Sequence, residues 1–219
     1  MAADEGVRLR FSDGRPLLTS LADINRILAD IGSHVWPLDL RRAPSEIQRL
    51  LQQPTLTKTE AEKVEAHFLL PRERLLEVIA VAGRAPHVRG GGALTTEVLT
   101  HAYSYPQLYL VQDNVDYSRF DRFHVNVADD GTGVDEVMQL LSGSGIVIVQ
   151  RLRKASVLTL HLDSPGWIAT YDGNNSHIGS LTKAEPGTKV LVQAIGPARW
   201  RMRYEDDSAS EHLGGGTQR

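Results

Sequence analysis

Residues 135–177 read DEVMQLLSGSGIVIVQRLRKASVLTLHLDSPGWIATYDGNNSH, and this stretch decides the fold. It contains four short apolar runs, and the first, third and fourth are followed directly by Gly, Pro, Asn or Asp residues. That pattern is typical of β-strands joined by tight turns. The runs cover residues 136–142, 146–152, 157–162 and 167–171. We therefore expect an antiparallel sheet that folds back on itself and carries Glu136 at its start and His177 just beyond its last turn.

The first half of the chain has helical patterns instead. Apolar residues recur there at helical spacing, with capping residues or prolines before them. The expected helices cover 20–31, 44–54, 57–69 and 71–83, and a short extended piece at 34–38 separates the first helix from the second. A Gly- and Pro-rich break at 84–93 then leads to strand patterns from Thr95 onward.

These patterns predict a mainly β protein of the α+β class. We expect an N-terminal helical region over 1–94, a β domain over 95–204 and a flexible tail over 205–219. Further strands in the β domain are expected at 95–105, 108–111, 120–127, 190–195 and 200–204.

The composition of the chain excludes several classes of partner and site. The net charge of the 219 residues is −3 with both signs mixed along the chain, so no basic stripe points to nucleic acid. No polybasic segment or long apolar run points to a membrane. The absence of cysteine excludes thiolate metal sites and a cysteine nucleophile. Since the N-terminus lacks the apolar core of a signal peptide, we expect a cytoplasmic protein.

Four polar residues in or beside the expected strands are candidates for metal binding or catalysis: His124, Asn126, Glu136 and His177. Two histidines and one carboxylate suit non-haem Fe(II), and the same ligands accept Ni, Mn or Zn. Without a metal, Glu136 or His177 would suit general acid–base catalysis. A single histidine in a strand is also commonly a hydrogen-bonded core or surface residue.

A second set of residues is suited to binding a small substrate. Tyrosine, asparagine and histidine side chains offer hydrogen bonds, and aromatic rings form the walls of ligand sites. The candidates are His101, Tyr103, Asn126, Trp167 and Tyr171. The aromatic members fit ordinary core packing equally well.

Two segments resemble the cupin superfamily, and within it the acireductone dioxygenases. Glu136 is followed by six residues and then Gly143, like the closing half of the first cupin motif. The segment from Pro165 through Gly173 to His177 has the length of the second motif. The N-terminal run ILADIGSHVWPLDL followed by helices is also similar to the leader of those dioxygenases. The resemblance implies a double-stranded β-helix, the cupin jelly-roll barrel, that holds a divalent metal.

The first cupin motif also has an H-x-H pair before its Glu, and this chain departs from it. Ungapped, the pair falls on Asp130 and Thr132; a loop of about six extra residues brings in His124 and Asn126 instead. The residues that the resemblance carries over as metal ligands are therefore Glu136, His177 and, with that loop, His124. Trp167 and Tyr171 stand where the second motif has Asp and Pro.

Three functions follow from these observations. The first is a metal-dependent enzyme, a non-haem dioxygenase acting on a small organic substrate with Fe(II) or another divalent metal. The second is a metal-free cupin of isomerase, cyclase or lyase type. The third is a small-molecule-binding cupin without catalysis. Because cupins commonly pair their strands between subunits, we also expect a homodimer.

Overall fold

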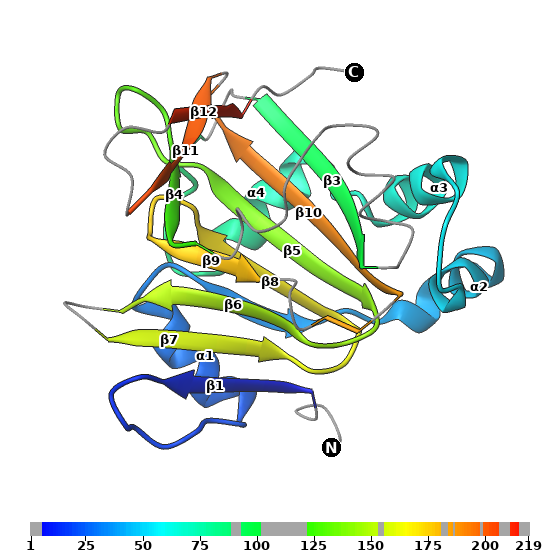
Figure 1. Cartoon of the computed structure of the whole chain (residues 1–219), viewed down its shortest axis with the longest axis horizontal. Helices are drawn as coiled ribbons and strands as arrows, with labels where there is room; N and C mark the ends of the chain where they lie inside the picture. The colour runs from blue at the N-terminus through cyan, green and yellow to red at the C-terminus, as the bar shows by residue number, and fades with distance from the viewer. Residues whose placement is uncertain are drawn as a thin grey trace.

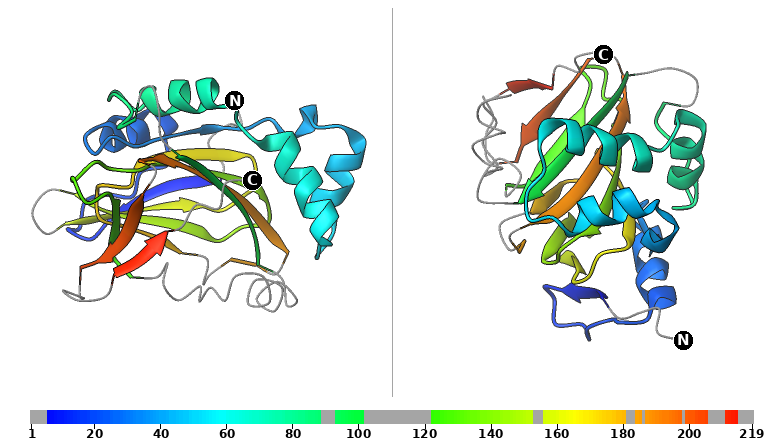
Figure 2. Two further views of the ribbon diagram at one scale, coloured as in Figure 1. Left: turned by 90° about the horizontal axis from the view of Figure 1, so that it is seen from above. Right: turned by 90° about the vertical axis from the view of Figure 1, so that its right-hand side faces the viewer.

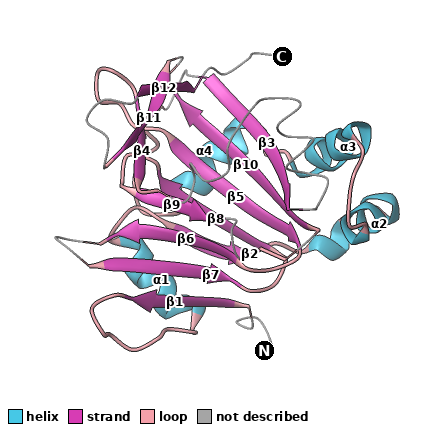
Figure 3. Cartoon of the chain, in the orientation of Figure 1, coloured by secondary structure: helices cyan, strands magenta, loops and turns pink. Residues whose placement is uncertain are grey.

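The computed structural model describes residues 6–88, 93–101, 122–152, 156–180, 184–185, 187–197, 199–205 and 211–214. This part of the chain forms two antiparallel sheets, and the helices lie on one side of them (Figures 1 and 3). Figure 2 (left) shows the helices on the side opposite to strands β11 and β12. The protein is thus β-rich, as the sequence predicts.

The larger sheet has seven strands in the order β1-β7-β6-β9-β4-β11-β12. Its strands are β1 (Val7–Phe11), β4 (His124–Val127), β6 (Ile146–Arg151), β7 (Val157–Leu162), β9 (His177–Ser180), β11 (Trp200–Tyr204) and β12 (Glu211–Gly214).

The smaller sheet has five strands in the order β2-β8-β5-β10-β3. Its strands are β2 (His34–Pro37), β3 (Ala93–His101), β5 (Asp135–Ser142), β8 (Trp167–Asp172) and β10 (Thr188–Gly196). All of its strand pairs are antiparallel.

The chain passes back and forth between the sheets. From β4 to β11 it changes sheet at every connection except the one between β6 and β7. The turns that allow this are the predicted ones: Gly143 and Gly145 between β5 and β6 both have a positive φ, which glycine adopts without steric cost. Residues from distant parts of the sequence therefore meet in the space between the sheets.

Strand β5 is buried on both faces, and its alternation separates the two sides of the smaller sheet. Met138 and Leu140 face the larger sheet and belong to a core shared with β1, β6 and β7. Val137 and Leu141 face the helices and belong to two other apolar clusters. Glu136 precedes Met138 by two residues and so points into the space between the sheets.

The helices cover the outer face of the smaller sheet or close its edge. They are α1 (Leu21–Ala29), the 3-10 helix η1 (Leu40–Arg42), α2 (Ser45–Gln52), α3 (Lys58–Phe68) and α4 (Arg72–Ala80). The predicted capping box of α3 is confirmed: Thr57 accepts a hydrogen bond from the Glu60 backbone N–H, and the Glu60 side chain accepts one from that of Thr57. Within the described ranges, no helix is long and apolar enough to cross a membrane.

Buried polar side chains fix the helices to this face. The Lys189 ammonium group of β10 is 1% exposed and donates to the carbonyl oxygens of Leu51, Gln53 and Gly187 at 2.5–3.2 Å. It thereby satisfies carbonyls at the C-terminus of α2, which have no partner within the helix. Gln193 similarly exchanges two hydrogen bonds with the backbone of Leu70 between α3 and α4.

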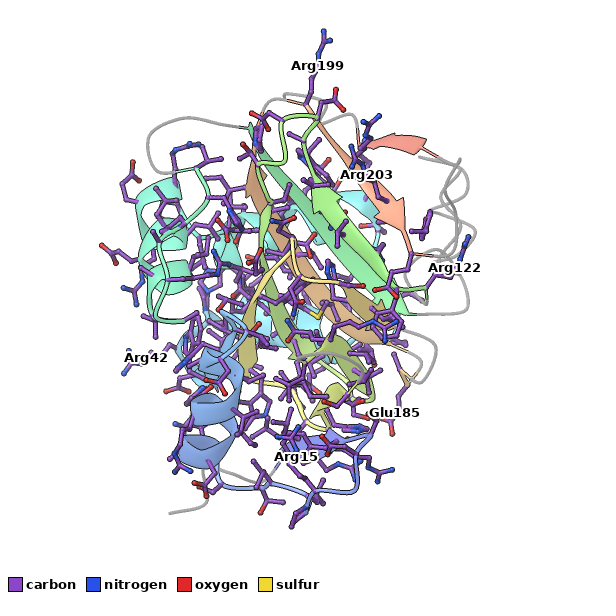
Figure 4. All side chains as sticks on the ribbon, turned by 90° about the vertical axis from the view of Figure 1, so that its left-hand side faces the viewer. Arg15, Arg42, Arg122, Glu185, Arg199 and Arg203 are labelled. Carbon is purple, nitrogen blue, oxygen red and sulfur yellow. The ribbon has the colours of Figure 1, made fainter. Side chains whose placement is uncertain are left out.

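Charged side chains elsewhere project outward on different sides of the molecule. Figure 4 shows this for Arg15, Arg42, Arg122, Arg199 and Arg203. They do not gather in one patch in that view, in keeping with the mixed charge of the sequence.

The N-terminal part of the chain departs from the expectation of a helical region, because it contributes one strand to each sheet. Strand β1 pairs with β7, and β2 pairs with β8. The burial of Val7, Leu9 and Phe11 has the period of two that marks a strand, although the sequence interpretation did not use it. Within the expected tail, β12 pairs with β11. The division of the chain at residues 94 and 204 stays a prediction.

The role of Lys189 is testable by Lys189→Met, which keeps an unbranched side chain but removes the donors. Three buried or part-buried carbonyl oxygens would lose a donor, so we expect the free energy of unfolding to fall by about 3 kcal/mol. Urea unfolding measures the change. Lys63→Met on α3, which breaks an exposed ion pair with Glu46, is the control and should cost less than about 1 kcal/mol. Equal losses in the two variants would contradict the assignment.

Candidate functional site

Two histidines from distant parts of the sequence lie side by side between the sheets. His124 opens β4, His177 opens β9, and the two residues are direct partners in the antiparallel pairing of these strands. Their ring centroids are 4.4 Å apart, and the exposed fractions are 2% and 1%. The pairing therefore places two imidazoles in one buried position.

Both rings are held in the same way. Nδ1 of His124 donates to the carbonyl oxygen of Arg122, and Nδ1 of His177 donates to that of Asn175, each at 2.8 Å. A carbonyl oxygen can only accept, so each Nδ1 carries a proton. The ring orientation is thereby fixed with Nε2 as the remaining nitrogen, the arrangement that metal-binding histidines commonly have.

Glu136 completes this group from the facing sheet. Its Oε2 lies 3.2 Å from His177 Nε2, and its Oε1 accepts a hydrogen bond of 2.5 Å from Asn126 Nδ2. Tyr171, the partner of Glu136 across β5 and β8, hydrogen bonds with the same carboxylate. Glu136 is 7% exposed, so its carboxylate is taken out of water but keeps three polar partners.

The charges follow from these contacts. Burial opposes ionisation, but the charge and hydrogen bond of Glu136 outweigh it and raise the pKa of His177, while His177 in turn lowers the pKa of Glu136. Burial, together with the neighbouring His177, lowers the pKa of His124 to about 4. The contacts thus favour a charged His177 against an ionised Glu136, while the low pKa of His124 keeps that ring neutral at pH 7.

Asn126 has one atom without a partner. Its Oδ1 is buried and forms no hydrogen bond with any described residue, while Nδ2 is used by Glu136. Leaving a buried acceptor unpaired costs about 1–3 kcal/mol, so such atoms in native proteins usually meet a ligand, ion or water.

Aromatic and apolar residues surround the polar group. The Tyr171 ring lies 5.0 Å from that of His177, and the Tyr204 ring lies 6.1 Å from that of His124. Tyr204 is the partner of His124 in the pairing of β11 with β4. Gly179, two residues beyond His177, would bring a Cβ to 3.7 Å from Met138, so the inward face of β9 is also in this region.

The other candidate residues lie elsewhere or outside the described ranges. Trp167 shares a strand face with Tyr171 but is four residues away, about 13 Å along β8. It packs in the core and its indole N–H donates to Ser164. His101 ends β3 and pairs with Thr188 through the backbone. Tyr103 lies outside the residues that the structure describes.

A second polar group lies near the site, and the sequence interpretation missed it. Asp135 and Asp172 are partners across β5 and β8, on the face opposite to Glu136 and Tyr171. His87 Nε2 lies 2.7 Å from Asp172 Oδ1, and the His87 backbone N–H donates to Asp135. Arg84 forms an ion pair with Asp135. No local pattern reveals this group, because the segment 84–88 meets these strands only in the folded chain.

Both polar groups contain residue types that bind metals, but of the two only the outer group has the close ligand spacing of a metal site among the described residues. Among the described residues, three ligand atoms within 4.8 Å of one another occur in His87, Asp135 and Asp172. There, however, Arg84 and His87 already neutralise two carboxylates that would otherwise repel each other across adjacent strands. We therefore interpret the His87 group as a clamp that holds the segment 84–88 on the sheet. His124 and His177 present ring nitrogens that no positive side chain occupies in this way.

The fold has a known counterpart. The acireductone dioxygenase of Bacillus anthracis, solved with a cadmium ion in its active centre, matches with a TM-score of 0.59 and 17% sequence identity. The match covers 89% of this chain and 94% of that one, which shows a shared fold. An N-substituted L-amino acid dioxygenase from Burkholderia ambifaria matches over 92% of this chain and 96% of its own at 10% identity, but its TM-score of 0.35 is too low to indicate a common fold. No protein-family model and no curated protein sequence matches this chain.

The clamp predicts a pH-dependent stability. Asp172, aided by Asp135, raises the pKa of His87 above its usual 6.5 against the effects of burial and Arg84. The contribution of charged His87 is therefore complete below pH 6.5 and disappears as the pH rises through the raised value. Burial opposes it, but the hydrogen bond from His87 lowers the pKa of Asp172 below 3.8, so the pair persists in mild acid.

We expect His87→Ala to lower the free energy of unfolding by about 1 kcal/mol at pH 6 and by clearly less at pH 9. Urea unfolding of the variant and the wild type at both pH values measures the difference. His67→Ala on the exposed side of α3 serves as the control and should show no such dependence. A loss of the same size at both pH values would contradict the clamp.

Proposed function

We propose that this protein is a metal-dependent enzyme of cupin type, a non-haem dioxygenase acting on a small organic substrate. The two sheets would then form the double-stranded β-helix of a cupin barrel. Three supports combine: the alternation of the chain between sheets, the fold shared with acireductone dioxygenase, and the polar group between the sheets. Since a shared fold does not imply a shared function, the proposal depends chiefly on the polar group.

One observation carries the proposal. His124 and His177 are both tied through Nδ1 to the carbonyl two residues before them, and Glu136 lies against Nε2 of His177. Two histidines with oriented rings beside a carboxylate are the ligands of the non-haem iron centres known as facial triads. A buried ion pair without such a role is costly to maintain, because both charges are removed from water.

The residues fit a divalent metal by their chemistry. His124, Glu136 and His177 would hold it, Fe(II) first and Ni, Mn or Zn as alternatives. When bound, such an ion supplies open coordination positions and, in the case of iron, redox chemistry. His177 Nε2 and the Glu136 carboxylate would both have to be free of protons to hold the ion, so any proton between them would be released to solvent on metal binding.

Other side chains would orient the ligands and the substrate. Asn126 and Tyr171 each form a hydrogen bond with the Glu136 carboxylate and so fix its direction. Burial raises the pKa of Tyr171 well above its usual value, as does the adjacent carboxylate, so this phenol stays protonated and can only donate to Glu136. We propose Tyr171 and Asn126 as substrate-binding residues, with His101, Tyr103 and Trp167 retained from the sequence as further candidates.

A metal-free enzyme of isomerase, cyclase or lyase type is the second candidate. The direct contact of Glu136 and His177 favours it, because a carboxylate and an imidazolium 3.2 Å apart can accept and donate a proton on the same small molecule. The neutral His124 beside them would offer a further acceptor. Binding without catalysis is the third candidate, and turnover of a bound ligand separates it from the second.

Location and assembly are further parts of the proposal. We propose a cytoplasmic protein that forms a homodimer and binds neither nucleic acid nor membranes. Light scattering at micromolar concentration tests the dimer: a mass near the 24.2 kDa of one chain would contradict it.

The decisive experiment is elemental analysis of anaerobically purified protein. We expect roughly one Fe, Ni, Mn or Zn per wild-type chain, and a loss of at least about tenfold in metal content in His177→Ala and Glu136→Gln, because each change removes a charged or lone-pair ligand. His87→Ala is the matched control, since it removes a histidine from the neighbouring polar group but leaves the proposed ligands in place.

The variants also separate the alternatives. Metal lost in His87→Ala and kept in His177→Ala would place the ion at the outer group and contradict our assignment. No metal in any sample, even after reconstitution, would contradict the dioxygenase and favour the metal-free enzyme. With metal present, oxygen consumption with diketones, enediols and catechol-like compounds would identify the substrate class.

A further inference from the structure

Asn126 has a fixed orientation within the site. Its amide nitrogen donates to Glu136 Oε1 at 2.5 Å. An ionised carboxylate can only accept, so this end of the amide must be Nδ2 and the other end must be Oδ1. The side chain therefore presents a carbonyl oxygen that is buried and has no partner among the described residues.

Backbone hydrogen bonds and close packing hold Asn126 with its side chain toward Glu136. Its backbone N–H donates to the carbonyl of Gly173 at 2.7 Å, and its carbonyl accepts from the N–H of Val134 at 3.1 Å. Gly173 packs so closely that a Cβ added there would lie 3.3 Å from the Cβ of Asn126 and 2.5 Å from the carbonyl oxygen of Val134. The backbone of β4 is thus held on this side, and the amide extends toward Glu136.

Asn126 also lies on the same strand face as a histidine of the site. His124 and Asn126 are two residues apart in β4, so their side chains point to the same side of the sheet. Both are 2% exposed. Asn126 hydrogen bonds with Glu136 of the facing sheet, and His124 lies against His177 of the neighbouring strand β9. A neutral oxygen acceptor and a ring nitrogen therefore lie next to the Glu136 carboxylate, and no lysine or arginine pairs with this carboxylate among the described contacts.

We propose that the Oδ1 atom of Asn126 is a fourth protein ligand of the divalent metal, beside His124, Glu136 and His177. This inference rests on the proposed function and makes its metal centre more specific. The amide then has two tasks, since its nitrogen orients Glu136 while its oxygen binds the ion. Two nitrogen and two oxygen donors make a harder ligand set than three histidines would, so the site should select Fe(II) or Mn(II) over Zn(II) or Cd(II) more strongly than a three-histidine site.

The first test measures metal affinity by calorimetry on metal-free full-length protein, with Mn(II) and Zn(II) titrated separately. In Asn126→Ala we expect Mn(II) affinity to fall about tenfold or more. In Asn126→His, a nitrogen replaces the oxygen, and we expect the ratio of Zn(II) to Mn(II) affinity to rise about tenfold or more. Gln52→His, which adds a histidine on the exposed side of α2, is the matched control and should leave both affinities unchanged. Thermal melts verify that each variant is folded.

The second test separates a ligand from a residue that only orients Glu136. Proton NMR of the protein loaded with Co(II) shows strongly shifted, exchangeable signals from the ring N–H of each histidine bound to the ion. We expect two such signals in the wild type and in Gln52→His, and three in Asn126→His. This readout does not depend on activity and remains informative if Asn126→Ala does not fold.

The outcomes are distinct. Two signals in Asn126→His, or unchanged Mn(II) affinity in a folded Asn126→Ala, would overturn the role of Asn126 as a ligand while leaving the metal centre intact. A wild-type protein that binds neither metal would instead overturn the proposed function itself. Two signals in the wild type, three in Asn126→His and the shift toward Zn(II) would establish the fourth ligand.

Discussion

The ion pair of Glu136 and His177 is the interaction on which the interior of this protein depends. A carboxylate buried between two sheets loses its hydration and remains ionised only where hydrogen bonds and an opposite charge replace the water. His177, Asn126 and Tyr171 supply these contacts from three different strands. Each of these strands must therefore keep its register, because a shift by one residue would turn the polar side chain to the other face.

The strand that carries Glu136 links the site to the helical cover. The inward residues of β5 extend from Glu136 into the apolar core between the sheets, while its outward residues pack under α2, α3 and α4. Buried Lys189 and Gln193 on the adjacent strand β10 hold helix ends and connections against the same face. The helices of the N-terminal region thus pack against the strand that carries Glu136. The strands of the same region, β1 and β2, each form one edge of a sheet.

Two polar groups lie on opposite faces of the same two strands, and they differ in how their charges are balanced. On the outer face, Asp135 and Asp172 are already neutralised by Arg84 and His87, which is the composition of a structural clamp. On the inner face, the single carboxylate of Glu136 has His177 as its only basic partner among the described contacts, beside His124 and an unpaired amide oxygen. In the inner group, the amide oxygen of Asn126 is left to accept from a ligand. In the outer group, the carboxylates already bind Arg84 and His87.

The sequence by itself determined the elements of the structure. Apolar runs, most of them ending at Gly, Pro, Asn or Asp, located β5, β6, β7 and β8 to within a residue or so. The capping box at Thr57 located the start of α3, because turns and caps depend on local sequence. The sequence did not predict strands β1, β9 and β12, each of which has only four or five residues. The residue types of the site were also visible, as histidine, asparagine and glutamate at strand positions.

Only the tertiary structure decided which of those residues meet. His124 and His177 are paired across 53 positions of sequence, and no local pattern contains the register that joins them. The same holds for Tyr204 beside His124 and for the contact of His87 with Asp172. Strand faces follow from alternation within a segment, but the neighbours across a sheet depend on pairings between distant segments, and those pairings are set by the packing of the whole chain.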